Sequence, residues 1–265
     1  MAVPPVAPAP VVLAPMVLAL SPHLDDAAFS CGGTLAQLAQ AGWRVTVATA
    51  FTRSVPDPQG FALACQTDKG LPPDADYMAL RRAEDAAAMA VLGAEPRWLD
   101  FPEAPHRGYG DARALFGEVR ADDTVDAPLA VRFAALLTEL RPTLLLAPQG
   151  VGGHVDHLLL IRALDRVAGG ASILWWRDFP YAARTNAPQP LGARFQALPE
   201  WTLDVAALTE RRLHGCAAYA SQLGFQFGGR ARLEERLAEA GPVERFRLSG
   251  TPPPGGRTGP GRTGG

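Results

Sequence analysis

The residues best suited to chemistry fall in two short clusters of histidine and aspartate. The clusters consist of His23, Asp25 and Asp26, and of His154, Asp156 and His157. Together they hold three of the five histidines in the chain. Two imidazoles and one carboxylate, from His23, Asp26 and His157, form the ligand set of a catalytic zinc site that keeps one position open for water. A structural zinc site would be closed and often use cysteine, and none of the three cysteines lies in either cluster.

The remaining cluster residues have the right chemistry to work beside such a metal. Asp25 could act as general base for a metal-activated water, whose pKa a zinc ion lowers toward about 7. His154 could donate to a developing oxyanion or protonate a leaving amine. Asp156 could orient and charge that imidazole, as carboxylates do for histidines. A base, a metal and an acid together indicate hydrolysis of an amide.

The elements that must position these clusters alternate between strands and helices. The pattern predicts strands at 11–20, 44–51, 97–101, 143–147 and 172–176, and helices at 27–42, 78–92, 130–140 and 157–167. This alternation predicts a three-layer α/β/α sandwich with a Rossmann-like, mostly parallel sheet. Each cluster follows a predicted strand and precedes a predicted helix. We therefore expect both at the carboxyl edge of the sheet, where open α/β folds bind their ligands.

The length of 265 residues and the composition indicate a chain with one globular α/β domain. We expect a Pro-rich leader at 1–10, the domain at 11–248 and a disordered Gly/Pro/Arg tail at 249–265. The segments 53–77 and 102–128 interrupt the alternation and are predicted to be long loops around the site. Three cysteines without a C-x-x-C pair argue against a disulfide framework.

Charge and hydropathy exclude several partners. A net charge of -2 and a pI near 6.2 provide no basic excess for nucleic acid. Residues 1–22 carry no charged side chain, but their six prolines and the absence of a basic segment argue against a membrane span or a secretory signal. We predict a cytoplasmic protein.

No G-x-G-x-x-G motif follows the first strand, so a nicotinamide cofactor is not expected. The sequence leaves the oligomeric state undetermined.

The two clusters also carry a family resemblance. The segment PHLDD, continued by the small residues 30–35, and the later HVDH resemble the two signature motifs of the LmbE/PIG-L family of zinc-dependent N-acetylglucosaminyl deacetylases. The R-x-x-E segment from Arg81 to Glu84, the loop Phe101-Pro102-Glu103 and the segment 219–222 are similar to further family elements. The resemblance covers roughly residues 16–225.

The resemblance implies roles at named positions. His23, Asp26 and His157 would bind the metal, Asp25 would be the general base and His154 the electrostatic and acid partner. Arg81, with Glu103 nearby, would bind substrate hydroxyls or an anionic appendage. Two features depart from the family pattern: Leu24 and Ala27 replace proline and glutamate of H-P-D-D-E, and Gly152 and Gly153 occupy the place of a tyrosine found in some relatives. The candidates to replace that tyrosine are Tyr109 and Tyr181.

We therefore predict a zinc-dependent hydrolase, with ferrous iron as the alternative metal, that removes the acetyl group from an N-acetylglucosamine-containing small molecule or glycoconjugate. The partner is a small amino sugar. Two alternatives remain open: an amidase acting on a larger sugar-thiol conjugate, and a catalytically silent metal- or sugar-binding protein. For single residues, the alternatives are a helix-capping role for Asp25 and Asp26, and a solvent-exposed role for Arg81.

Overall fold

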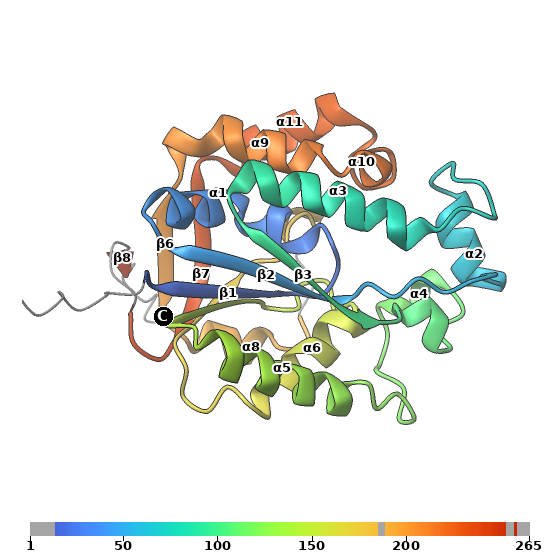
Figure 1. The fold of residues 1–265 in the computed structure, drawn as a ribbon, viewed down its shortest axis with the longest axis horizontal. Coiled ribbons are helices and arrows are strands. Elements are labelled where there is room, and N and C mark those ends of the chain that lie inside the picture. Colours follow the sequence, from blue (N-terminus) through green and yellow to red (C-terminus); the bar gives the residue numbers. More distant parts are fainter. Residues whose placement is uncertain (1–13, 185–188, 253–256, 259–265) are drawn as a thin grey trace, which may run out of the picture.

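The chain folds around one mixed sheet of eight strands in the order β3-β2-β1-β4-β5-β7-β6-β8 (Figure 1). The computed structural model describes residues 14–184, 189–252 and 257–258. Its strands are β1 Met16–Ser21, β2 Arg44–Phe51, β3 Glu95–Phe101, β4 Leu144–Pro148, β5 Ile173–Trp176, β6 Glu200–Asp204, β7 Val243–Ser249 and β8 Arg257–Thr258.

The first five strands pair with one another in parallel, and every pair that involves one of the last three is antiparallel. β1 pairs in parallel with β2 and β4, and these pair in parallel with β3 and β5. The pairs β5–β7, β7–β6 and β6–β8 are antiparallel. Helices connect the parallel strands, because a parallel pair needs a long crossover. The predicted mostly parallel sheet is confirmed.

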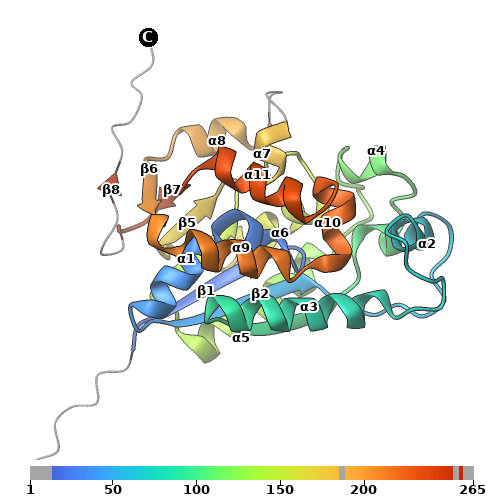
Figure 2. The same cartoon turned by 90° about the horizontal axis from the view of Figure 1, so that it is seen from above.

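Helices cover both faces of the sheet (Figures 1 and 2). The helical segments are α1 Asp26–Gln40, α2 Gly60–Thr67, α3 Tyr77–Leu92, η1 Ala104–Arg107, α4 Ala112–Leu115, α5 Asp126–Leu140, α6 Val155–Asp165, α7 Tyr181–Arg184, α8 Gly192–Gln196, η2 Ala206–Leu208, α9 Thr209–Ala217, α10 Ala220–Phe227 and α11 Arg230–Ala240. α1, α3 and α9 pack on one face, and α5 and α6 on the other. In β1, Val17 and Ala19 point to the first core, and Leu18 and Leu20 to the second. The three-layer sandwich is confirmed.

All nine predicted strands and helices are present, with boundaries that differ by a few residues. The predicted strand 11–20 begins at Met16 in the structure, and its residues 11–13 lie outside the described part. The two segments predicted as loops need correction. Segment 53–77 contains α2, and segment 102–128 contains η1 and α4. Their polar residues and prolines masked short helices that are too brief to show a clear apolar period.

The C-terminal region also differs from the prediction. Ser249 ends β7, and β8 pairs with β6 through Trp201↔Thr258 and Thr202↔Arg257. Part of the predicted disordered tail is therefore a strand, while residues 253–256 and 259–265, like the leader at 1–10, lie outside the described residues. No helix within the described ranges is long and apolar enough to span a membrane.

Candidate active site

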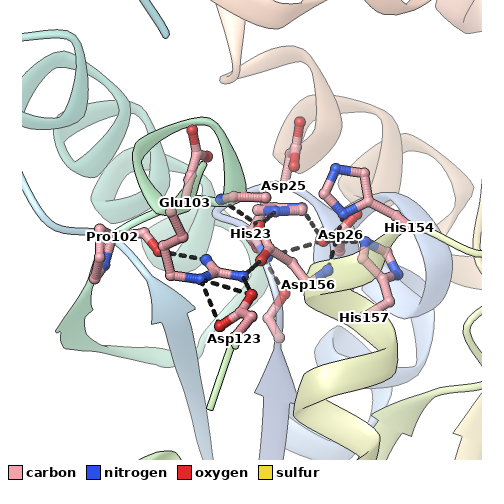
Figure 3. Close-up of polar contacts among 12 residues, drawn as sticks. His23, Asp25, Asp26, Pro102, Glu103, Asp123, His154, Asp156 and His157 are labelled. Carbon is pink, nitrogen blue, oxygen red and sulfur yellow. Dashed lines mark hydrogen bonds and ion pairs between the residues drawn. The ribbon is translucent and has the colours of Figure 1, made fainter. Parts of the chain in front are cut away.

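The two histidine-aspartate clusters meet at the carboxyl edge of the sheet (Figure 3). His23 lies two residues after β1, and Asp25 and Asp26 begin α1. The second cluster begins α6: His154 is its N-cap, and His157 lies in its first turn. Because β1 and β4 are parallel neighbours, their ends deliver both clusters to one place.

Local hydrogen bonds shape the turn after β1. The Ser21 hydroxyl donates to the His23 carbonyl at 2.7 Å and accepts the Ala27 amide at 3.2 Å. Asp26 Oδ2 accepts the amide of His23 at 2.8 Å. These bonds fold the segment back on itself, so that the His23 imidazole and the Asp26 carboxylate face the second cluster. Asp25 occupies the N-cap position of α1 but makes no side-chain capping bond, which argues against the capping alternative for this residue.

His23, Asp26 and His157 bring three candidate metal-ligand atoms together. Asp26 Oδ2 lies 3.1 Å from His23 Nδ1 and 3.2 Å from His157 Nε2. The donor atoms of this group all lie within 4.8 Å of one another. The opposite nitrogen of each ring faces a carboxylate: His23 Nε2 lies 3.0 Å from Asp156 Oδ2, and His157 Nδ1 lies 2.8 Å from Asp178 Oδ1. Such partners fix the tautomer of metal-binding histidines and leave the facing nitrogens for the ion.

The electrostatics of this group suit a divalent cation. Burial alone would lower the pKa of His157, but Asp26 and Asp178 raise it to about 9. Burial likewise opposes the charge on His23, yet Asp26 and Asp156 raise its pKa well above the ordinary value. Burial would raise the pKa of Asp26, and the two imidazoles hold it well below its usual range. Within the described residues, no hydrogen bond of good geometry satisfies the buried His157 Nε2. The two histidines thus tend to hold protons at nitrogens where a metal ion could bind instead. The donor set of two imidazoles and one carboxylate fits zinc or ferrous iron.

Asp156 has a different role from the one expected. Its carboxylate contacts His23, accepts the Ala104 amide at 3.1 Å and pairs with Arg107 at 2.6 Å. Its only hydrogen bond to His154 comes from the backbone: the Asp156 amide donates to His154 Nδ1 at 3.2 Å. Asp156 therefore orients a candidate ligand, His23, and not His154. Burial opposes its charge, but His23 and Arg107 lower its pKa below the ordinary value. The alternative metal group of His23, His154 and Asp156 is less suitable, because Arg107 already neutralises this carboxylate.

His154 is held as a neutral hydrogen-bond donor. Burial, together with repulsion from His23, lowers its pKa to about 3. Since Nδ1 accepts the Asp156 amide, the remaining proton of the neutral ring is on Nε2. The His154 ring stands edge-on to His23, with centroids 4.9 Å apart. This geometry favours stabilisation of an oxyanion over donation from an imidazolium.

Asp25 and Glu103 share one buried guanidinium. Arg81 Nη2 donates to Asp25 Oδ1 at 3.3 Å, and Nη1 donates to Glu103 Oε1 at 2.6 Å. Burial, aided by Asp26, raises the pKa of Asp25 against the opposing effect of Arg81. Arg81 is 4% exposed, so the solvated alternative does not apply. Glu84, its possible helical partner, instead accepts hydrogen bonds from the Ser221 amide and hydroxyl.

A cavity of about 240 Å³ opens above these groups. Its polar floor consists of His23, Asp25, Asp26, Arg81, Glu103, His154 and Asp156. A larger cavity of about 360 Å³ lies elsewhere, beside Arg177 and Arg245, and contains no cluster residue, so the chemistry belongs to the smaller one.

The two tyrosine candidates separate in the structure. Tyr181 lines the cavity, with its ring edge-on to His157 at 5.8 Å. Tyr109 is buried elsewhere: its hydroxyl donates to Asp123 at 3.0 Å and accepts the Arg120 amide at 3.2 Å. The substrate-binding expectation for Tyr109 is therefore corrected. Gly152 adopts a φ of +94°, and a Cβ at this position would lie 3.1 Å from the Tyr181 side chain. Tyr181 thus fills the space beside the glycine that stands where some relatives have tyrosine.

Sequence reasoning missed two groups that hold the site. Asp178 follows β5 by two residues and contacts His157, and Arg107 joins Asp156 to Asp123. The strand-end rule could have found Asp178, because β5 neighbours β4 in the parallel part of the sheet. Arg107 had no such signal, since it comes from η1 within a segment predicted as a loop.

Comparisons with known proteins agree with this geometry. Residues 18–168 match the family described as PIG-L, GlcNAc-PI de-N-acetylase. The 2'-N-acetylparomamine deacetylase of Streptomyces fradiae is 32% identical over 212 residues, which are 77% of this chain and 72% of that protein. The 1D-myo-inositol 2-acetamido-2-deoxy-alpha-D-glucopyranoside deacetylase of Kineococcus radiotolerans is 31% identical over 181 residues, covering 59% and 46% of the two chains. The solved structure of a zinc-inhibited form of teicoplanin deacetylase is 27% identical, covers 88% of this chain and 97% of that chain, and gives a TM-score of 0.74.

The chain belongs to the PIG-L family, because the family match spans more than half of its length. The family resemblance inferred from the two motifs is confirmed. The enzyme class is also confirmed as a deacetylase, a hydrolase of linear amides, in agreement with these relatives.

Proposed function

We propose that this chain is a zinc-dependent hydrolase that removes the N-acetyl group from an N-acetylglucosamine-containing small molecule or glycoconjugate. Relatives named for N-acetylated paromamine and for a 2-acetamido-glucopyranoside of inositol support the amino-sugar part of the substrate. The observation that carries the proposal is the convergence of three candidate metal ligands, two of which, His23 and Asp26, line the cavity together with Asp25 and His154. Ferrous iron remains the alternative metal, because imidazole and carboxylate bind both.

The metal would be held by His23, Asp26 and His157. When bound, a divalent cation supplies Lewis-acid polarisation and makes a water molecule acidic enough to attack near neutral pH. Asp156 and Asp178 hold the two imidazoles in the required tautomers. Both carboxylates are themselves hydrogen-bonded, so the ligand nitrogens face inward before the ion arrives.

Asp25 acts as the general base. It takes a proton from the attacking water as that oxygen bonds to the acetyl carbonyl carbon. The same proton can then pass to the amide nitrogen when the C–N bond breaks, which yields a free amine and acetate. Burial raises the pKa of Asp25 toward the range useful for a base, and Arg81 keeps its carboxylate oriented.

His154 stabilises the negative charge that develops on the carbonyl oxygen. Its neutral ring offers Nε2–H as a donor and needs no proton transfer to do so. Tyr181 lies on the cavity wall and is the candidate for a second donor. Glu103, fixed by Arg81, is suited to accept hydrogen bonds from sugar hydroxyls, and Arg81 contributes its charge beneath them.

Amine release by the zinc-reconstituted protein tests the proposal. The protein is incubated with N-acetylglucosaminides that carry different groups on the anomeric carbon, and a chelator-treated sample is the control. We expect stoichiometric amine and acetate that appear only with metal. Absence of release from every substrate, with one metal bound per chain, would favour the silent binding protein or the larger-amide alternative.

A further inference from the structure

The mouth of the catalytic cavity is built from different residues than its floor. Four apolar side chains, here called the aromatic rim, surround it: Phe61, Leu115, Phe116 and Phe225. They come from α2, from the end of α4 and from α10, three segments that lie at the same end of the molecule in both views (Figures 1 and 2). The chain thus brings apolar groups from distant parts of the sequence to one opening.

Two rim residues are unusually exposed for their type. Phe116 is 46% exposed and Phe225 is 64% exposed. Only three other large hydrophobic residues of the described part are comparably exposed: Leu80, Trp98 and Val131. None of those three lines the cavity, and scattered exposure of this kind is ordinary. Two exposed phenylalanines at the mouth of a catalytic cavity indicate instead a surface that a ligand covers.

The rim begins beside the reacting groups. The Phe116 ring stands edge-on to His154, with centroids 5.2 Å apart, and lies 5.9 Å from the Tyr181 ring. A group bound against Phe116 is therefore a direct neighbour of the sugar whose amide reaches His154. The aglycone, the part joined to the amino sugar, would fit this position.

Phe225 is held in place while remaining open to solvent. The Lys69 ammonium lies 4.8 Å from the centroid of its ring and 5.2 Å from that of Tyr77. Lys69 also donates to the Cys65 carbonyl. A cation on one face orients the ring. Because the ring is still mostly exposed, the rest of its surface remains free for contact.

Two amide side chains near the rim, Gln222 and Gln226, already have partners within the protein. The Gln222 amide contacts the Tyr77 hydroxyl and the Ser221 hydroxyl. Gln226 accepts hydrogen bonds from Arg184. The rim therefore offers mainly apolar contact, beside the Asp68 carboxylate that also lines the cavity.

We propose that the aromatic rim binds an apolar aglycone, an aryl group or an alkyl chain, of the amino-sugar substrate. This inference rests on the proposed deacetylase function and names its substrate class. The charged floor takes the N-acetylglucosamine unit, and the rim takes the apolar part by removing it from water.

Deacetylation of four substrates with one sugar unit in common tests the inference. The substrates are 4-nitrophenyl N-acetylglucosaminide, octyl N-acetylglucosaminide, free N-acetylglucosamine and diacetylchitobiose. We expect kcat/KM to be about 10- to 50-fold higher for the first two than for free N-acetylglucosamine, as burial of one ring or short chain predicts. The comparison of aryl with alkyl distinguishes ring stacking from simple burial. Equal kcat/KM for all four, or preference for diacetylchitobiose, would overturn the proposal.

Variants locate the preference on the rim. Phe225→Ala and Phe116→Ala should each reduce the ratio of kcat/KM for the aryl substrate over free N-acetylglucosamine by about 5- to 20-fold. Phe225→Leu should restore much of it, because leucine keeps apolar bulk. The matched control is Val131→Ala, which changes another exposed apolar residue, on α5 and outside the cavity lining, and should leave the ratio unchanged. A ratio insensitive to both phenylalanine changes would contradict the role of the rim.

A binding measurement separates this inference from the proposed function. Calorimetry compares 4-nitrophenyl glucosaminide, the expected amine product, with glucosamine. Tighter binding of the aryl compound, lost in Phe225→Ala, supports the rim even if no substrate is turned over, which would be a failure of the proposed function alone. Turnover of all substrates with equal binding of both amines would refute the rim and leave deacetylation intact.

Discussion

The floor and the mouth of the cavity are built by opposite means. The floor is a closed network of buried ions in which the side chains of His23, Asp25 and Asp156 each meet a partner of opposite charge. The mouth consists of apolar side chains, of which the rings of Phe116 and Phe225 remain exposed to water. Buried charges tolerate little rearrangement, because an unpaired one is costly. Exposed rings can accept different ligands at little structural cost. We infer that the reaction is fixed by the floor and the choice of aglycone by the mouth.

Asp25→Asn should have the largest effect on the floor. The amide keeps the size of the carboxylate but cannot accept the proton, so kcat should fall about 10²- to 10⁴-fold. Metal content, measured by elemental analysis on the same sample, should remain near that of the unmodified protein. Full activity would contradict the role of Asp25, and loss of metal would place it among the ligands.

Arg107→Met should lower the stability of the folded chain more than it impairs catalysis. The guanidinium lies 2.6 Å from Asp156 Oδ1 and 3.0 Å from Asp123 Oδ2. Its removal leaves two buried carboxylates without this cation, which costs about 3–5 kcal/mol in free energy of unfolding. Urea denaturation measures the change. The control Arg97→Met breaks an exposed pair with Glu95 and should cost less than about 1 kcal/mol. Equal losses would show that burial does not distinguish the two arginines.

Asp85 offers a buried carboxylate held mainly by neutral donors. It accepts hydrogen bonds from Trp98 Nε1 at 2.8 Å and from the Tyr219 hydroxyl at 2.7 Å. Burial raises its pKa from 3.8 to about 6. The folded state then binds more protons than the unfolded state between these values, so stability is greatest at the acidic end of this window and falls as the pH rises through about 6.

Across this pH window, the raised pKa of Asp85 changes the free energy of unfolding by about 2–3 kcal/mol. Thermal unfolding of Asp85→Asn between pH 4 and 7, set against the unmodified chain, measures it: the variant should lose this part of the pH dependence. If the variant kept the same pH dependence of unfolding, this dependence would come from the titratable groups of the cavity floor and not from Asp85.

Asp178→Asn should weaken the metal site most selectively. The carboxylate contacts His157 Nδ1 at 2.8 Å, and loss of such a partner lowers metal affinity about 10- to 100-fold. Competition with a chelator gives the affinity. The control is Asp165→Asn. Asp165 is the last residue of α6, the helix that carries His157, and its partly exposed carboxylate pairs with Arg194. Comparable losses in the two variants would argue for a general effect on the helix.

The elements of the parallel half of the sheet were predictable from local pattern. Buried strands such as Leu144–Pro148 are continuous apolar runs, and their helices have clear starts and stops, such as Gly93 after α3. The antiparallel half was not predicted. β7, with Glu244, Arg245 and Arg247 along it, carries too many charges to be recognised as a strand of the sheet. Glu244 is nevertheless buried against Arg212, a pairing that depends on chain folding.

The candidate site divides in the same way. His23, Asp25, Asp26 and His157 were recognisable because residue type and position after a strand both pointed to metal chemistry. Arg81 and Glu103 were found by family resemblance, and the structure adds that they share one ion-pair network. The carboxylate partner of His154 was predicted incorrectly, because sequence adjacency suggested Asp156 while the fold turned that side chain toward His23.

By itself, the sequence determined the chemical inventory: two histidine-carboxylate clusters, placed at strand ends whose parallel arrangement follows from the alternation of strands and helices. Only the tertiary structure decided which groups pair. Asp178, Arg107 and the rim phenylalanines come from segments far from the clusters in sequence, and their contacts depend on distances that local pattern does not encode. The physical reason is that side-chain type limits what a residue can do, while burial and neighbouring charge in the folded chain fix its protonation, orientation and role.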